Sequence, residues 1–301
     1  MNPPTFDYFK YHGLGNDYLV VPPAVFGPEL SPELVRALCD RHRGPGSDGV
    51  LLGPLPPEAL GVSGGRGPAL RIFNPDGSEG EKSGNGLRIF ARYLWEHGLA
   101  PERNFSIHTK GGTVQARVLN AQGSRIAMSM GPVRFHSTVI PVTGAPREVL
   151  GETLHIAGRD WLLNAATVGN PHCVVQVEEP TEALAREIGP LLERHPWFPN
   201  RTNVQFLKVL DSHAIRIEIW ERGAGYTQAS GTSSCASAAV ACRLGLCRSP
   251  VTVHMPGGML EIRLDQEFQA EMEGEVRAVA AGRLAGEFLE LLNLRRRNET
   301  P

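Results

Sequence analysis

The sequence has little cysteine, no long apolar run and almost no net charge. Its five cysteines are an odd number in 301 residues, which argues against a disulfide framework. Cys235, Cys242 and Cys247 lack the C-x2-C spacing of zinc sites, so we expect buried packing residues and no metal. The net charge of −2, with one basic run at Arg295–Arg297, gives no reason to expect a nucleic acid as partner. Because no stretch of 18 apolar residues occurs and the start has no signal-peptide core, we expect a cytoplasmic protein with no membrane partner.

An internal repeat is the strongest organising feature of the sequence. HGLGNDYLVV (12–21) aligns with ATVGNPHCVV (166–175), and RIFNPDGSEGEKSGNG (71–86) aligns with EIWERGAGYTQASGTS (218–233). The second match places Ser83 and Gly84 on Ser230 and Gly231. Chance similarity of glycine-rich turns is the alternative. We interpret the matches as duplicated halves, and the length fits two domains of about 150 residues. The expected N-terminal half is 1–130, joined by 277–301, and the expected C-terminal half is 131–276.

Each half contains one apolar helix among short strands. After Ser83, apolar residues recur at helical spacing from Leu87 to Leu94, and Gly98 is a helix stop signal. After Ser230 the segment SSCASAAVACRLG is small and apolar nearly all round, which indicates an enclosed helix. The remaining segments are short, rich in Val, Ile and Leu, and separated by glycine and proline. The sequence therefore predicts an α+β fold in which each half is a curved sheet or barrel around a central helix.

The two helix starts predict an anion site with flanking hydroxyls. Unpaired N–H groups and the helix dipole favour a carboxylate at Gly84 and Asn85, and again at Gly231 and Thr232. Ser83 and Ser230 directly precede these starts. A carboxylate held with one side chain on each face of its α-carbon is the geometry that proton removal and return require for inversion.

These segments resemble the signature segments of a known family. HGLGNDYLVV, IFNPDGSEGEKSGNGLRIFARY, VGNPHCVVQV, FPNRTNVQF and WERGAGYTQASGTSSCASAAVA resemble those of diaminopimelate epimerase, in order, across most of the chain. The resemblance implies a cofactor-independent isomerase, with no pyridoxal phosphate, that acts on an amino-acid substrate. It would interconvert L,L- and meso-diaminopimelate on the way to lysine and peptidoglycan. It also implies two pseudo-symmetric domains with the active site in the cleft between them, and a homodimer.

The resemblance also assigns residues to the site. Arg222 would hold the distal carboxylate by a bidentate contact, and Glu221 and a set of asparagines would bind the ammonium and carboxylate groups. His172 and Tyr226 are possible supporting residues, and His172 is as consistent with a structural role as with a catalytic one. Taken singly, an asparagine beside glycine indicates only a turn, and Arg222 after Glu221 is consistent with a surface pair. The asparagines are Asn16, Asn74, Asn85, Asn170 and Asn203.

The sequence departs from the family at the two acid/base positions. The family has cysteines where this chain has Ser83 and Ser230. A helix N-terminus can lower the pKa of a thiol from about 8.5 to about 3.5–7.5. The pKa of a serine hydroxyl starts several units higher, so we expect impaired proton transfer. Either cysteines were exchanged on purpose for near-isosteric serines, or this is a natural homologue that has diverged. The second explanation is favoured because further positions depart from the family pattern: Gly49, Lys82, Tyr226, Ser233 and Ser234.

Three other functions are compatible with parts of the sequence. GPGSDG fits the G-x-G-x-x-G spacing of dinucleotide sites, but it follows a polar helix end and leads into a short strand, which is the wrong context. A serine hydrolase would use Ser83 or Ser230 with His108 or His172, but neither serine has the glycine of a nucleophile elbow two residues earlier. A catalytically lost homologue that binds another amino acid stays open as the alternative to an epimerase.

Overall fold

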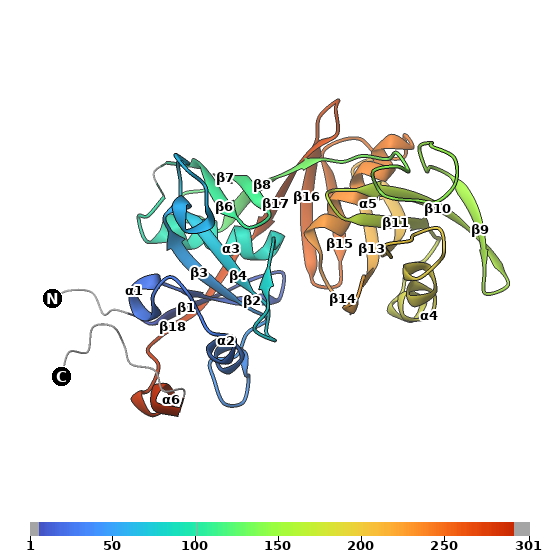
Figure 1. The fold of residues 1–301 in the computed structure, drawn as a ribbon. Helices are drawn as coiled ribbons and strands as arrows, with labels where there is room; N and C mark the ends of the chain where they lie inside the picture. Colours follow the sequence, from blue (N-terminus) through green and yellow to red (C-terminus); the bar gives the residue numbers. More distant parts are fainter. Residues whose placement is uncertain (1–5, 101, 292–301) are drawn as a thin grey trace. The chain divides into compact units, whose positions relative to one another are not determined.

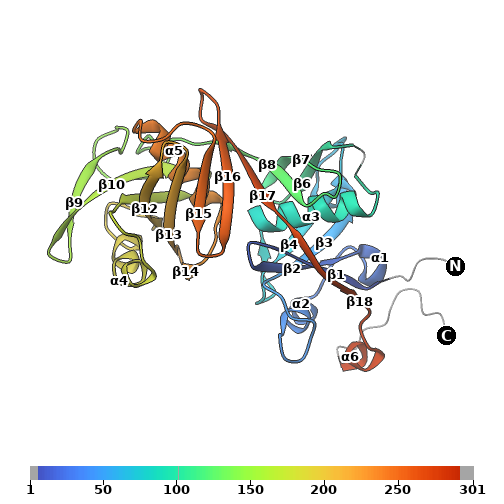
Figure 2. The same ribbon diagram turned by 180° about the vertical axis from the view of Figure 1, so that it is seen from behind.

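The chain folds as two compact units. The computed structural model describes residues 6–100 and 102–291, and the basic run Arg295–Arg297 lies outside them. Unit 1 consists of Met1–Met128 and Gly274–Pro301, and unit 2 consists of Ser129–Glu273. The chain leaves unit 1 within β8 (Arg125–Pro132) and returns within β17 (Gln269–Glu275), as Figure 1 and the rear view in Figure 2 let the reader follow.

Unit 1 is a mixed sheet with a small number of helices. Its remaining strands are β1 (Tyr8–Gly13), β2 (Asn16–Val21), β3 (Val50–Leu55), β4 (Ala69–Phe73), β5 (Glu79–Gly80), β6 (Asn104–Thr109), β7 (Gly112–Val118) and β18 (Arg277–Gly282). Its helices are α1 (Pro23–Phe26), α2 (Pro32–Cys39), α3 (Gly84–Glu96) and α6 (Gly286–Leu291), with a 3-10 turn at Pro57–Leu60.

Unit 2 is built in the same way. Its strands are β9 (Glu152–Ile156), β10 (Arg159–Thr167), β11 (Pro171–Gln176), β12 (Asn203–Asp211), β13 (Ala214–Glu221), β14 (Gly225–Thr227), β15 (Val251–Met255) and β16 (Gly258–Leu264). Its helices are α4 (Glu182–Glu193) and α5 (Gly231–Arg243).

The strands of the two units pair in one repeated order. In unit 1, β1 is antiparallel to β2, β2 parallel to β3, β3 antiparallel to β4, and β4 parallel to β6. In unit 2, β10 is antiparallel to β11, β11 parallel to β12, β12 antiparallel to β13, and β13 parallel to β15. A parallel pair needs a long crossover, and the equivalent helices α2 and α4, then α3 and α5, lie in these crossovers. The shared order agrees with the duplication that the sequence matches predict.

The central helix of each unit is enclosed by strands of that unit. Helix α3 packs on β1, β2, β3 and β7, and Leu87, Phe90, Ala91 and Leu94 are all fully buried. It ends at Glu96 with His97 as its C-cap, and Gly98 follows with a left-handed backbone, φ 65°. Helix α5 packs on strands β10, β11, β12, β13, β15 and β16 and is buried nearly all round. Both helices therefore begin directly after the two serines, and α3 ends near Gly98, as the sequence predicts.

A second helix covers the other face of each sheet. Leu34 and Leu38 of α2 belong to one apolar cluster with Leu19 of β2 and Leu52 of β3. Ile188 and Leu192 of α4 belong to the equivalent cluster in unit 2, with Val175, Val204 and other strand residues. Because these strands are buried on both faces, they contain short apolar runs without alternation, such as Leu19–Val21 in β2 and Val50–Leu52 in β3.

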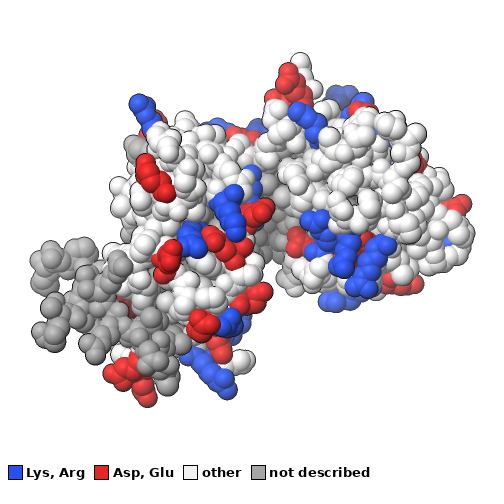
Figure 3. Space-filling view, in the orientation of Figure 1, with Lys and Arg blue, Asp and Glu red and all other residues white. Residues whose placement is uncertain are grey.

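Other expectations concern cysteines, metals and surface charge. None of the five cysteines forms a disulfide, and Cys235 and Cys247 are buried as expected, whereas Cys242 at the end of α5 is partly exposed. Among the described residues, no cluster of His, Cys, Asp and Glu could hold a metal ion, and no helix is long and apolar enough to cross a membrane. Basic and acidic side chains are interspersed over the unit 1 part of the face in Figure 3. Two ion pairs of this unit join Arg41 to Asp48 and Arg71 to Glu79.

Candidate active site

Ser83 caps the central helix of unit 1. Its backbone is extended, and its Oγ accepts a hydrogen bond from the Gly86 N–H at 3.1 Å, which satisfies one donor of the first turn. The N–H groups of Gly84 and Asn85 belong to that same turn, where no helix carbonyl is available to them. Ser83 has a further contact that capping does not explain, because its Oγ lies 3.1 Å from the hydroxyl of Tyr18. The partly exposed hydroxyl of Ser83 is therefore joined to an ionisable group.

Asn16 and Asn85 form an oriented amide pair. Asn85 Nδ2 donates to Asn16 Oδ1 at 3.1 Å, and Asn16 Nδ2 donates to Asp48 Oδ2 at 3.0 Å. At the other end, Asn85 Oδ1 accepts from Nη2 of the fully buried Arg88. A carboxylate accepts only and a guanidinium donates only, so these two charged ends fix which way both amides point. The structure thus brings together two of the predicted substrate-binding asparagines.

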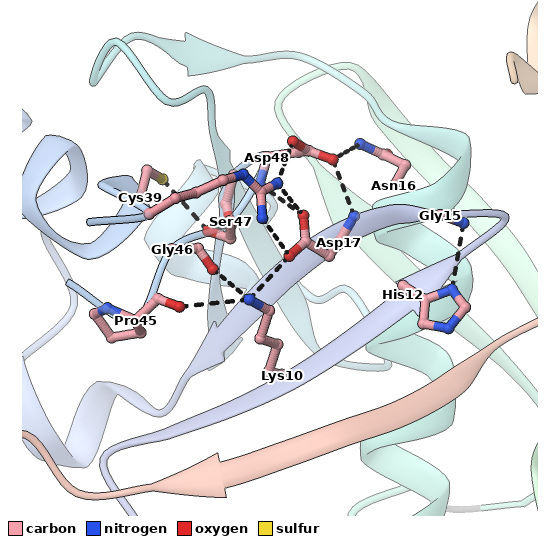
Figure 4. Close-up of polar contacts among 12 residues, drawn as sticks. Lys10, His12, Gly15, Asn16, Asp17, Cys39, Pro45, Gly46, Ser47 and Asp48 are labelled. Carbon is pink, nitrogen blue, oxygen red and sulfur yellow. Dashed lines mark hydrogen bonds and ion pairs between the residues drawn. The ribbon is translucent and has the colours of Figure 1, made fainter. Parts of the chain in front are cut away.

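Asp48 is itself held by a charged network, drawn in Figure 4. Arg41 Nη2 donates to Asp48 Oδ1 at 2.7 Å and to Asp17 Oδ1 at 2.6 Å, while Lys10 Nζ lies 3.0 Å from Asp17 Oδ2. Burial raises the pKa of Asp17, but the hydrogen bonds from Arg41 and Lys10 outweigh burial and lower the pKa to about 2. The network ties the loop before β3 to the start of β2, where Asn16 lies.

Asn74 and Gly84 have local roles in unit 1. Asn74 is exposed in the turn after β4, and its Nδ2 donates to Ser78 Oγ at 3.0 Å. Its backbone also closes this turn through Ser78 and Gly77. The geometry of Asn74 is that of a turn residue, which is the simpler of its two sequence interpretations. The carbonyl of Gly84 accepts from Arg88 Nη1 at 3.3 Å.

Ser230 caps the central helix of unit 2. Its Oγ accepts from the Ser233 N–H and lies 3.5 Å from Thr232 Oγ1, and Ser230 and Gly231 are both buried. The Glu221 carboxylate, at the end of β13, lies close enough to Ser230 for the serine hydroxyl to act on its pKa. Burial raises the pKa of Glu221, and the nearby Ser230 hydroxyl offsets only part of that effect. Both predicted acid/base serines therefore have an ionisable side chain beside them.

Two buried side chains hold the backbone at Arg222. Asn203 Oδ1 accepts from the Arg222 N–H at 3.0 Å, and Asn203 Nδ2 donates to the Pro171 carbonyl at 2.9 Å. Glu193, at the end of α4, accepts from the Gly223 N–H at 3.1 Å. The Arg222 side chain is exposed, with one bond from Nη1 to the Asn200 carbonyl at 3.0 Å. Glu193 could not be predicted from the sequence, because nothing in its own helix distinguishes it from a surface glutamate.

His172 is a neutral buried imidazole. Its Nε2 lies 3.0 Å from Asn170 Oδ1, which assigns the proton to Nε2 because an amide oxygen only accepts. Burial lowers the pKa of His172 to about 3, because it outweighs the contact with Gln205, which raises the pKa, and the charge of Arg222 lowers it further. Nδ1 has no well-aligned partner among the described residues. Of the two interpretations of His172, this geometry favours a structural histidine that orients Asn170.

Tyr226 lies on a different face from Glu221. It pairs with Trp220 across β13 and β14, and adjacent residues of a strand point to opposite faces, so Tyr226 and Glu221 are on opposite sides. Its hydroxyl donates to Glu218 at 2.7 Å, and the Arg186 guanidinium of α4 lies 4.8 Å from its ring centroid. Tyr226 thus packs toward α4. Its position in the strand pairing sets which face of the sheet its side chain is on, and its nearness to Ser230 in sequence has no influence on this.

Known proteins match this chain over most of its length. The family model described as diaminopimelate epimerase matches residues 8–136 and 164–279. The chain is 51% identical to "Diaminopimelate epimerase 2" of Nostoc sp., over 94% of this chain and 97% of that protein. It is 41% identical to the diaminopimelate epimerase of Moorella thermoacetica, over 85% of this chain and 90% of that protein.

Solved structures with little sequence identity share the fold. A probable proline racemase from Agrobacterium radiobacter K84 matches with a TM-score of 0.66 at 18% identity, over 94% of this chain and 93% of that one. A Bacillus anthracis phenazine biosynthesis protein of the PhzF family matches with a TM-score of 0.60 at 16% identity, over 94% and 100%. These likenesses confirm the predicted α+β fold. From the family match and the identity to the named relatives, the chain belongs to the diaminopimelate epimerase family, a family of amino-acid isomerases of lysine biosynthesis.

Proposed function

We propose that this chain epimerises diaminopimelate between its L,L and meso forms without a cofactor, and that Ser83 and Ser230 stand at the two acid/base positions. One observation carries the assignment of the serines. In each unit, a serine caps the enclosed helix and has an ionisable side chain beside its hydroxyl: Tyr18 lies 3.1 Å from Ser83 Oγ, and Glu221 lies near Ser230. A capping serine alone would not need such a partner.

Inversion at an α-carbon needs one group that removes the proton and a second that returns it to the other face. Removal leaves negative charge that spreads into the substrate carboxylate. The N–H groups of Gly84, Asn85, Gly231 and Thr232 are the donors for that carboxylate, because helix N-termini favour negative charge. The oriented pair of Asn16 and Asn85 adds amide donors whose direction is already fixed.

The distal end of the substrate is assigned to Arg222. Its backbone is held by Asn203 and, through Gly223, by Glu193, while its guanidinium reaches solvent and has free donors for a carboxylate. Glu221 is the adjacent group for an ammonium or for the Ser230 proton. Asn170, oriented by His172, supplies a further amide.

The serines lower the expected rate. A serine hydroxyl is a much weaker acid than a thiol, so almost no alkoxide forms near neutral pH and the base strength must come from the bonded partner. We therefore expect slow epimerisation. The competing function is an amino-acid-binding protein that has lost the chemistry, and the departures from the family pattern at Gly49 and Tyr226 are what favour it.

Restoring thiols separates the two functions. The variants Ser83→Cys, Ser230→Cys and the double replacement are assayed for conversion of L,L- to meso-diaminopimelate, with Ser237→Cys in α5 as a matched control. If the chain is an epimerase, the conversion rate should rise strongly in the double variant and much less in either single variant, because both faces of the α-carbon need a suitable acid or base. If the double variant binds diaminopimelate, melts like the wild type and converts none, the epimerase assignment is wrong and the binding function replaces it.

The proposal also covers the oligomeric state of the protein and its location in the cell. A homodimer and a cytoplasmic location follow from the family resemblance and the sequence, and both stay predictions. Sedimentation at several protein concentrations tests the dimer.

A further inference from the structure

The hydrogen bond between Tyr18 and Ser83 is the contact around the serines that helix capping leaves unexplained. Tyr18 lies in β2, is 8% exposed, and its hydroxyl is 3.1 Å from Ser83 Oγ across a separation of 65 residues. Ser83 Oγ also accepts the Gly86 N–H at 3.1 Å. The cap is therefore complete without the tyrosine, and the phenol contact needs a reason of its own.

Gly49 leaves the space that the Tyr18 ring occupies. A Cβ at position 49 would lie 2.5 Å from Tyr18 Cε1 and 2.6 Å from the Phe73 carbonyl, so any other residue would displace the ring or strain the backbone. The chain therefore has, at one point, both the phenol and the glycine that makes room for it. This pairing fixes the phenol against the serine.

We propose that Tyr18 is a positioning residue that exchanges the substrate proton through the Ser83 hydroxyl. The inference rests on the proposed function and adds the group that a serine at an acid/base position lacks. A hydroxyl has one proton to donate and two lone pairs to accept with. Gly86 occupies one lone pair, so the protonation state of Tyr18 decides what Ser83 presents to the substrate.

The two states of the pair correspond to the two roles that inversion needs. When Tyr18 is a phenol it donates to the second lone pair of Ser83, and the serine proton then points at the substrate as an acid. When Tyr18 is a phenolate it accepts the serine proton, and the free lone pair of Ser83 faces the α-hydrogen as a base. The pair thus acts as an acid or a base without a free alkoxide.

The proton balance is complete. In the base direction, the α C–H bond breaks, its electron pair stays on the α-carbon, the proton moves to Ser83 Oγ, and the original serine proton moves to the Tyr18 oxygen. The reverse sequence returns a proton from Tyr18 through Ser83 to the α-carbon. A phenol ordinarily ionises near pH 10, far below a serine hydroxyl, and the N-terminus of α3 favours the negative charge.

The equivalent place in unit 2 holds a different pair of groups. The repeat aligns His172 with Tyr18, and His172 is fully buried, neutral and bonded to Asn170. The ionisable group beside Ser230 is the Glu221 carboxylate instead. The relay is therefore a feature of unit 1, and a substitution at Tyr18 should affect one of the two proton transfers.

A double-mutant cycle tests the relay. Wild type, Tyr18→Phe, Ser83→Cys and the double variant are compared for deuterium wash-in at the α-carbon of diaminopimelate, with thermal melting as a check on folding. Tyr18→Phe should lower the rate of deuterium wash-in by at least about 100-fold, the low end of what a general acid or base contributes. In the Ser83→Cys background the same change should cost far less, because a thiolate needs no phenol. Tyr11→Phe is the matched control, since Tyr11 is a buried unit 1 phenol bonded to Glu96.

The pH profile is the readout that a packing role would not move. In the wild type, the rate of deuterium wash-in should rise toward alkaline pH, and the pH of the inflection should fall when fluorotyrosine is incorporated. In Ser83→Cys, fluorotyrosine should leave the pH of the inflection unchanged. Equal losses from Tyr18→Phe in both backgrounds, or no inflection shift, would overturn the relay and leave the epimerase intact. A wild type without exchange beside an active double cysteine variant also overturns it. If neither exchanges any proton, the proposed function itself fails.

Discussion

At the scale of single residues, the proposed acid/base roles of Ser83 and Ser230 depend on acidity, because a serine hydroxyl is nearly the size of a cysteine thiol but a much weaker acid. Ser83 and Ser230 could be predicted as helix caps because a serine before an apolar helix is a local signal. Tyr18, Asp48 and Glu193 could not. Each acts on a residue far along the chain, as Tyr18 does on Ser83 65 residues away and Glu193 on Gly223 30 residues away. Spacing rules describe neighbours only.

Arg222 gives the first prediction at this scale. Arg222→Ala removes a charge-assisted contact and leaves the distal carboxylate of diaminopimelate without its partner, so binding should weaken by about 2–5 kcal/mol. Titration calorimetry measures the loss. Arg216→Ala is the control, because Arg216 lies on β13, the strand that Arg222 follows, and pairs with the surface residue Glu179. Unchanged affinity in Arg222→Ala would remove Arg222 from the site.

At the scale of elements, the start of α3 is held by groups outside the helix. The amide pair of Asn16 and Asn85 joins β2 to α3, and Asp48 joins both to the loop before β3. The helices themselves were predictable from apolar spacing and from glycine at the end. Their surroundings were not, because the conformation of the loop with Gly46 and Gly49 depends on contacts with Arg41 and Tyr18.

Asp17 gives a prediction about this network. Its pKa is lowered from 3.8 to about 2, so its contribution to stability is present above pH 3.8 and is lost as the pH falls through about 2. Asp17→Asn should cost about 2 kcal/mol at pH 7 from a shift of this size. Urea unfolding measures the difference, which should shrink as the pH falls from 4 to 2. Glu33→Gln, which changes an exposed side chain of α2, should show no measurable change. A loss that stays constant with pH would mean that packing, not charge, makes Asp17 important.

At the scale of the whole molecule, two units with one order of strand pairings account for the repeat in the sequence. The predicted family and the α+β fold are confirmed by the comparisons. They could be predicted because the signature segments lie at the ends of equivalent elements: Asn16 and Asn170 at the starts of β2 and β11, and Ser83 and Ser230 before α3 and α5. Side-chain roles were harder to predict. Asn74 closes a turn and Tyr226 faces α4, since the strand ladder decides direction and a motif does not.

Ligand linkage gives a prediction for the whole protein. A ligand that binds only the folded chain stabilises it by about 2.7 kcal/mol at 100 times its Kd, so diaminopimelate should raise the melting temperature by several degrees. Lysine and ornithine lack the distal carboxylate for Arg222 and should give smaller shifts. A larger shift with either one would favour an amino-acid-binding protein of different specificity.

The central claim is that this chain moves a proton at the α-carbon of diaminopimelate by way of two serines. The most direct test follows L,L-diaminopimelate by NMR in D2O with the wild-type protein, beside Ser83→Cys/Ser230→Cys. The account predicts deuterium at the α-carbon together with the meso isomer, slower in the wild type by about 100-fold or more, as expected for a weaker acid and base. Absence of deuterium in both proteins, at a concentration that saturates the melting shift, would contradict it.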